Sequence, residues 1–183
     1  HICGGSIISS TAVLTVAQCI TGPNFQYTVR AGSTFINKGG STHNIQEMIR
    51  HAQYRTNVYD VPINDIALLT LKERLKIDNV RNPVRLVEQG MVTSEGSTAN
   101  ITGWARTDTG SSNHLQLVSV PVVSKQKCND ACGSSSGIPA GQICVGTPTK
   151  SQGDAGSPML IGGIQIYTEI AAYCDWIRDR SGI

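Results

Sequence analysis

Three short segments carry the residue types with which this chain could attack a carbonyl group. They are Val13–Cys19 (VLTVAQC), Asn64–Leu68 (NDIAL) and Gly153–Pro158 (GDAGSP). Acyl transfer by a triad needs a hydroxyl that attacks, an imidazole that takes and returns its proton, and a buried carboxylate that orients the imidazole. Asp65 supplies the carboxylate. Ala155 has no lone pair, and the Gln18 amide neither gains nor loses a proton near neutral pH, so neither can fill the other two roles.

These segments resemble the motifs of the trypsin-like serine proteases, and the resemblance runs through nearly the whole chain. In that family the last segment reads G-D-S-G-G-P and contains the nucleophile, and the first reads V-L-T-A-A-H-C and contains the general base. The resemblance makes Gln18, Asp65 and Ala155 vestigial triad positions. It also implies a vestigial oxyanion hole at the backbone N–H groups of Gly153 and Ala155. We expect a hydrogen bond between Gln18 and Asp65, because the glutamine amide can still donate.

The residues at positions 18 and 155 predict that no catalytic residue is functional and that the chain is not an enzyme. Losing a triad costs about 10⁶-fold in rate, which is roughly 8 kcal/mol of barrier. An engineered serine-to-alanine change is the alternative explanation of Ala155. Gln18, and Ser157 in place of the family's second glycine, favour degeneration instead.

Other parts of the protease pattern are also missing. Ser151 stands where the family has a cysteine that braces the specificity pocket, and Gly162 to Gln165 replaces the longer stretch that forms one pocket wall. The chain begins at His1, beyond the family's I-V-G-G start, so Asp154 has no visible partner. Either the natural molecule lacks these segments or it is longer than 183 residues.

The composition argues against several classes of function. The net charge is +2 and only 15% of the residues are charged, so we expect neither a nucleic-acid partner nor a membrane partner. No apolar run approaches the roughly 18 residues that a membrane-spanning helix needs. The four histidines are scattered without metal-ligand spacing, and we expect no metal and no cofactor.

Six cysteines without C-x-x-C or Cys/His metal spacing predict disulfides and a secreted, extracellular protein. Spacing alone allows about 15 connectivities. The resemblance implies the bridges Cys3–Cys19 and Cys128–Cys144, and Cys132 is then expected to pair with Cys174. Free thiols at the last two positions are the alternative.

Short Val/Ile/Leu runs between glycine, serine and threonine residues predict an all-β protein. The resemblance implies two antiparallel six-stranded β-barrels of the trypsin-like type and a short C-terminal α-helix. We expect an N-terminal barrel over residues 1–84, and a C-terminal barrel with a terminal helix 170–181 over residues 85–183. Ile170, Tyr173, Cys174 and Ile177 recur at helical spacing, and Gly182 follows them.

Asn100-Ile101-Thr102 is a sequon for N-linked glycosylation. It falls within an expected strand, so we expect Asn100 to be an unmodified strand residue.

The combination of Gln18 with a lost serine is similar to the scabies-mite inactivated serine-protease paralogues. That family is secreted into the mite gut and faeces, where its members bind host complement components and inhibit complement. The resemblance therefore implies an immune-evasion protein that binds complement proteins through surface exosites. The alternatives are a non-catalytic cofactor or decoy homologue in an arthropod protease cascade, a competitor that masks peptide substrates, and a hydrolase that uses unfamiliar groups.

Overall fold

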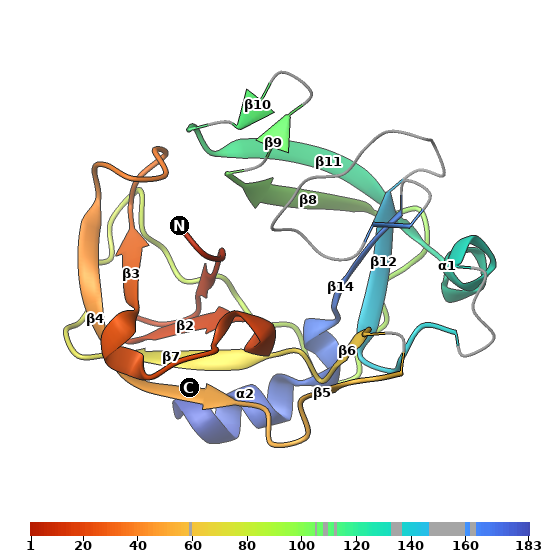
Figure 1. Ribbon diagram of the computed structural model, residues 1–183, viewed down its shortest axis with the longest axis horizontal. Coiled ribbons are helices and arrows are strands. Elements are labelled where there is room, and N and C mark those ends of the chain that lie inside the picture. The colour runs from red at the N-terminus through yellow and green to blue at the C-terminus, as the bar shows by residue number, and fades with distance from the viewer. Residues whose placement is uncertain are drawn as a thin grey trace.

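A computed structural model describes residues 1–58, 60–104, 106–107, 110–111, 113–132, 137–146, 160–161 and 164–183, and for residues 106, 107, 110, 111, 132, 160 and 161 it describes the backbone alone. Two strongly curled antiparallel sheets form two half-barrels, and two short α-helices lie outside them (Figure 1). The expected mostly β architecture is therefore present. Each main sheet has five strands in the described part of the chain, where six were predicted.

The first sheet has the strand order β1-β2-β7-β4-β3. Its strands are β1 (Ser6–Ile7), β2 (Ala12–Thr15), β3 (Thr28–Ala31), β4 (Ser41–Arg50) and β7 (Ala67–Leu71). The paired strands β2 and β7 are mostly apolar, with one threonine each, because both of their faces are largely buried. Val13 opposite Leu69 packs inside the half-barrel, while Leu14 opposite Leu68 packs beneath the C-terminal helix.

The second sheet has the strand order β13-β14-β12-β11-β8. Its strands are β8 (Thr98–Gly103), β11 (Gln116–Val123), β12 (Gln142–Gly146), β13 (Leu160–Ile161) and β14 (Ile164–Thr168). Helix α1 (Lys125–Cys132) lies against β12. Its Cys128 packs with Cys144, Ile164 and Ile166 in a small buried cluster that joins the helix to the sheet.

Two hairpins and three single 3₁₀ turns complete the described elements. The hairpins are β5 (Arg55–Thr56) with β6 (Pro62–Ile63) and β9 (Arg106–Thr107) with β10 (Gly110–Ser111); the turns are Ala17–Cys19, Asn24–Gln26 and Ile170–Ala172. No helix in the described part of the chain is both long and apolar enough to cross a membrane.

The C-terminal helix begins later than predicted. The expected helix 170–181 is divided into the 3₁₀ turn Ile170–Ala172 and the helix α2 (Cys174–Ser181), which ends at Gly182 in the left-handed region. Between the two lies Tyr173, with a backbone φ of −127° and ψ of 8°, which is not helical. Tyr173 is held in place because it is buried and its hydroxyl donates to Asn64 Oδ1 at 3.1 Å.

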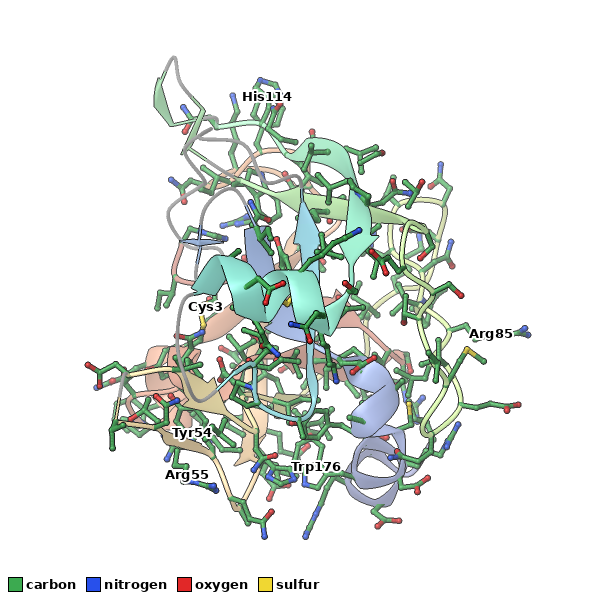
Figure 2. The ribbon with its side chains drawn as sticks, turned by 90° about the vertical axis from the view of Figure 1, so that its right-hand side faces the viewer. Cys3, Tyr54, Arg55, Arg85, His114 and Trp176 are labelled. Carbon is green, nitrogen blue, oxygen red and sulfur yellow. A yellow bond between two sulfur atoms is a disulfide. The ribbon has the colours of Figure 1, made fainter. Side chains whose placement is uncertain are left out.

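Helix α2 packs on the first sheet, although it follows the second sheet in sequence. Ile177 is fully buried in a cluster with Leu14, Ile66 and Leu68, and Trp176 packs at its edge. Figure 2 labels Trp176, which belongs to α2, near the bottom of the molecule in that view. The end of the chain therefore ties the two half-barrels together near the start of β7.

Candidate functional site

Asp65 and Gln18 lie next to each other, as predicted. Gln18 lies in the 3₁₀ turn that follows β2, and Asp65 lies just before β7, the strand that pairs with β2. The Gln18 backbone N–H donates to Asp65 Oδ1 at 2.8 Å. The Gln18 side chain and the Ala17 backbone N–H lie close enough to the same carboxylate to lower its pKa. A turn and a strand that are adjacent in the sheet therefore bring these two predicted site residues together.

The Asp65 carboxyl group is buried, with only 7% of the residue exposed. Burial raises the pKa of this carboxyl above its ordinary value, and the hydrogen bonds from Gln18 and Ala17 oppose that rise. Burial is also the main reason that the pKa of Tyr54 and that of Tyr173 are raised, and the negative charge of Asp65 adds to both shifts. The carboxylate therefore lies in a surrounding of low polarity and is stabilised by amide donors.

Both half-barrels hold the backbone around Asp65. Thr168, at the end of β14 in the second sheet, donates its hydroxyl to the Asp65 carbonyl oxygen at 2.7 Å. Asn64 has a left-handed backbone with φ of 53°, and its side chain accepts the Tyr173 hydroxyl. This conformation, which asparagine tolerates better than most residues, turns the chain into β7. Asp65 therefore lies at the junction of the two sheets.

The remaining predicted site positions lie outside the described residues. They are Gly153 and Ala155, together with Ser151 and Asp154. The predicted triad and oxyanion positions consequently stay predictions, except for the contact between Gln18 and Asp65.

Two of the three predicted disulfides are present. Cys3 is bonded to Cys19, and Cys128 is bonded to Cys144. The third prediction, Cys132–Cys174, is wrong, because Cys174 is a free and fully buried cysteine. Its thiol donates to the Ile170 carbonyl oxygen at 3.3 Å. The physical reason is that α1 lies against the second sheet and α2 against the first (Figure 1).

Gln142 is a buried polar residue that the sequence analysis did not single out. Its Nε2 donates to the Pro62 carbonyl oxygen at 2.6 Å, while its Oε1 has no hydrogen-bond partner among the described residues. The signal in the sequence was a single polar side chain at the start of the apolar strand Gln142–Gly146. Gln142 links β12 to the β5–β6 hairpin, and its free oxygen can accept one donor.

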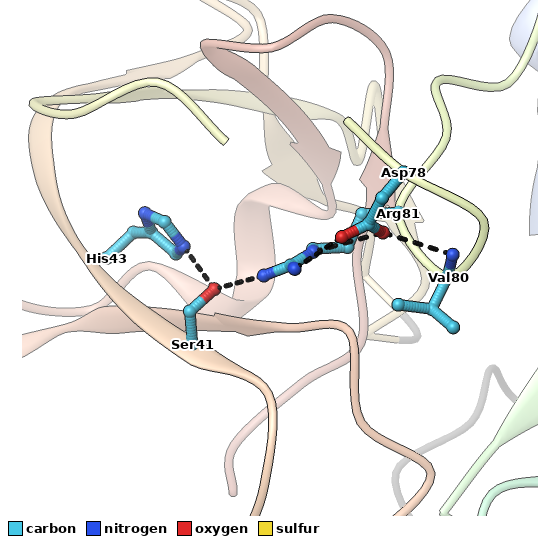
Figure 3. Close-up of polar contacts among 5 residues, drawn as sticks. All are labelled: Ser41, His43, Asp78, Val80 and Arg81. Carbon is cyan, nitrogen blue, oxygen red and sulfur yellow. Dashed lines mark hydrogen bonds and ion pairs between the residues drawn. The ribbon is translucent and has the colours of Figure 1, made fainter. Parts of the chain in front are cut away.

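A second polar network was also missed (Figure 3). Arg81 forms an ion pair with Asp78 at 2.6 Å and donates to Ser41 Oγ at 2.8 Å. Because Arg81 can only donate, the single Ser41 hydroxyl proton is free to bond His43 Nε2, which lies 2.7 Å away. The hydrogen bond from Arg81 is the main cause that lowers the pKa of the Asp78 carboxyl. The network fastens the segment between the two sheets to β4.

The four histidines occupy separate places. His1 packs edge-on against Trp104. His51 packs edge-on against Tyr173 and at a tilt against Trp176, and His114 packs at a tilt against Phe35. His43 is hydrogen-bonded to Ser41. Within the described residues, no three His, Cys, Asp or Glu side chains gather in a way that could hold a metal ion.

A groove of about 730 Å³ opens inside the first half-barrel. We call it the β3 groove. Its walls are the edge strand β3, the chain start His1–Gly5, Val80, Trp104 and Leu115. Trp104 donates its indole N–H to the Thr34 carbonyl oxygen at 2.9 Å, so the second half of the chain contributes a fixed wall. An edge strand presents backbone N–H and C=O groups that its own sheet does not use, and a chain in extended conformation can pair with them.

Comparisons with known proteins agree with the fold of two half-barrels. Among solved structures, the chain is similar in fold to neuropsin, a serine protease of mouse brain, with a TM-score of 0.81 and 24% identity over 98% of this chain and 89% of that one. It is also similar to the scabies mite inactivated protease paralogue S-D1, with a TM-score of 0.83 and 20% identity over 98% and 87%. These likenesses show a trypsin-like fold.

The family follows from sequence. The family model for trypsin matches residues 1–167. Two curated relatives are 31% identical: "Trypsin Blo t 3" of Blomia tropicalis, over 98% of this chain and 77% of the relative, and "Trypsin" of Phaedon cochleariae, over 100% and 80%. The chain belongs to the trypsin family.

These relatives contradict the prediction that the chain is not an enzyme. They are named trypsins, which are enzymes, and membership of their family favours an enzyme here. The prediction rested on the residue types at positions 18 and 155 and set aside the alternative of a hydrolase that uses unfamiliar groups. Hydrolysis by this chain would have to use groups other than a Gln18 base and an Ala155 nucleophile.

Proposed function

We propose that this member of the trypsin family binds other proteins through its surface, and that its partners are complement components of a host. The observation that carries the proposal is the β3 groove. It combines a volume of about 730 Å³ with apolar side chains in its walls and an edge of β3 that pairs with no other strand in the described part of the chain. Such an edge beside an apolar groove suits an extended segment of a partner, which adds to the sheet through main-chain hydrogen bonds.

Exposed apolar side chains at the rim support binding. Ile2 is 64% exposed and Val80 is 62% exposed, and both line the β3 groove. Covering them with an apolar segment would remove both from water, which is the main favourable term in protein association. The partner class comes from the sequence resemblance to the scabies-mite inactivated paralogues. It is consistent with the fold likeness to the scabies mite inactivated protease paralogue S-D1.

The test is complement-mediated lysis of antibody-coated red cells in the presence of the purified chain. We expect lysis to fall with increasing concentration of the chain, and purified complement components to bind it in a surface assay. Val80→Glu places a charge on the groove wall and should weaken both effects at least about tenfold, equivalent to about 1.4 kcal/mol. Val58→Glu is the matched control, because Val58 is 91% exposed and lies in the loop of the β5–β6 hairpin.

Two results would count against this proposal. Unchanged lysis in every complement pathway would remove complement as the partner class. Equal inhibition by the wild type and Val80→Glu would remove the β3 groove as the binding surface.

Peptide hydrolysis is a second candidate function, because the curated relatives are named trypsins. Its test is turnover of fluorogenic peptides by the purified chain. Asp65→Ala serves as the control for contaminating proteases: turnover that belongs to this chain should fall in the variant, whereas turnover by a contaminant should not.

A further inference from the structure

Asn100-Ile101-Thr102 is the only Asn-X-Ser/Thr sequence in the 183 residues. The sequence predicted an unmodified strand residue, and the strand is indeed there, as β8. Two properties of that strand, its place in the sheet and the direction of its side chains, nevertheless make it accessible. The sequon is thus a single, well-defined position at which glycosylation can be tested.

β8 is the edge strand of the second sheet in the described part of the chain. Its residues alternate between exposed and half-buried, and Thr98, Asn100 and Thr102 are the exposed set. Because side chains alternate between the two faces of a strand, both sequon side chains that matter for modification, Asn100 and Thr102, lie on the same solvent-facing side.

One hydrogen bond orients the Asn100 amide. Ser119, directly opposite on β11, donates its hydroxyl to Asn100 Oδ1 at 2.7 Å. The oxygen end of the amide is therefore turned toward the neighbouring strand. The nitrogen Nδ2, which is the atom that carries an N-linked sugar, is the end that Ser119 does not engage.

The two disulfides supply an independent observation about the compartment. Cys3–Cys19 and Cys128–Cys144 are bridges of the kind that form and persist in oxidising environments, above all the secretory route. Asn-X-Ser/Thr sequences are glycosylated in proteins that take this route. The chain therefore meets the glycosylation machinery while its only sequon is still unfolded, and the folded structure leaves room for the product.

We propose that Asn100 carries an N-linked glycan. In the transfer step, a bond forms between Asn100 Nδ2 and C1 of the first sugar of a lipid-pyrophosphate-linked oligosaccharide. The bond that breaks joins that C1 to the pyrophosphate oxygen. The lipid pyrophosphate leaves with the electron pair, and the amide nitrogen gives up one proton.

The glycan has a physical consequence for the surface. Leu117 lies opposite Thr102, on the face that bears Asn100, and is 65% exposed. A glycan at Asn100 covers this apolar side chain with polar sugar. The outer face of β8 and β11 is then a shielded surface, on which no protein partner docks.

The experiment is secretion of the full chain from a eukaryotic cell that also secretes a known glycoprotein as an internal standard. The intact mass should exceed the 19.5 kDa of the polypeptide and return to it, with Asn100 converted to Asp, after amidase treatment that removes N-glycans. Asn100→Gln and Thr102→Ala should abolish the added mass. Thr102→Ser keeps the sequon and should retain it, and so should Thr98→Ala, a change on the same face outside the sequon.

A wild-type chain secreted at its bare polypeptide mass, beside a glycosylated standard, would overturn the proposal. Added mass that persists in Asn100→Gln would also overturn it, because the modification would then lie elsewhere. Circular dichroism and the unfolding midpoint of the variants show whether each has folded. The wild-type chain secreted in the presence of a glycosylation inhibitor gives the reference for a chain that keeps its sequon but lacks sugar.

Discussion

Truncation of Ile177 tests whether helix α2 holds the start of β7, where Asp65 lies. Ile177 is fully buried and packs with Ile66, the residue after Asp65. Ile177→Ala removes three methyl or methylene groups, which is about 2.4 kcal/mol at about 0.8 kcal/mol each. The cavity left behind adds to this, so we expect a loss of about 3–4 kcal/mol in the free energy of unfolding, within the range of about 2–5 kcal/mol for such changes.

The measurement is urea unfolding followed by tryptophan fluorescence, with thermal unfolding as a second probe. In a chain of 183 residues, this loss corresponds to a fall of roughly 10 °C in Tm, at about 2–4 °C per kcal/mol. Ile183→Ala is the matched control, because Ile183 is 48% exposed and should change stability by less than about 0.5 kcal/mol. A loss below about 1 kcal/mol for Ile177→Ala would refute the packing of α2 on the first sheet.

Three further predictions concern the site and the cysteines. An alkylating reagent should modify Cys174 only after denaturation, because burial raises the pKa of its thiol and shields the sulfur from the reagent. Peptide mass mapping identifies the modified residue. A peptide in which Cys132 is linked to Cys174 would contradict the prediction of a free thiol. The pKa of Asp65 is raised above 3.8, so the folded chain binds its proton more tightly than the unfolded chain does. Asp65 should therefore make the free energy of unfolding fall as pH rises from 3.8 through the folded pKa. Urea midpoints measured across acidic pH should show this fall in the wild type and not in Asp65→Asn. The same pH dependence in both chains would refute the prediction. Replacing Cys128 and Cys144 with alanine opens a loop with a sequence separation of 16 and should cost about 3 kcal/mol, measured by urea unfolding against the oxidised wild type. Under reducing conditions, which also open Cys3–Cys19, the difference between the variant and the wild type should disappear if the bridge is responsible.

The parts that the sequence predicted well lie on neighbouring strands of the first sheet. The contact between Gln18 and Asp65 follows from a turn directly after one buried strand and a residue directly before its partner strand. Cys3 and Cys19 flank the β1–β2 hairpin, so its turn brings them together. In both cases the resemblance to the trypsin-like proteases supplied the prediction, and the pairing of neighbouring strands supplies the geometry.

The parts that failed depend on packing between distant segments. The pairing of Cys174 was inferred from the count of cysteines, whereas its burial depends on α2 crossing back to the first sheet. The Arg81 network joins residues 40 apart along the chain, and no periodicity marks such a pair. The helix boundary was wrong because Tyr173 leaves the helical region to reach Asn64 on the other side of the junction.

Asp65 shows why one triad residue in place says little about proton transfer. A buried carboxylate is costly unless donors satisfy it, and here the backbone N–H of Gln18 donates to it, with the Ala17 N–H and the Gln18 side chain close by. The bond from the Gln18 backbone holds the 3₁₀ turn after β2 and does not depend on the side chain at position 18. Since Thr168 also bonds the Asp65 carbonyl, the residue joins the first sheet to the second. The carboxylate therefore has a structural role sufficient to explain its presence, and catalysis has to be judged from measured turnover.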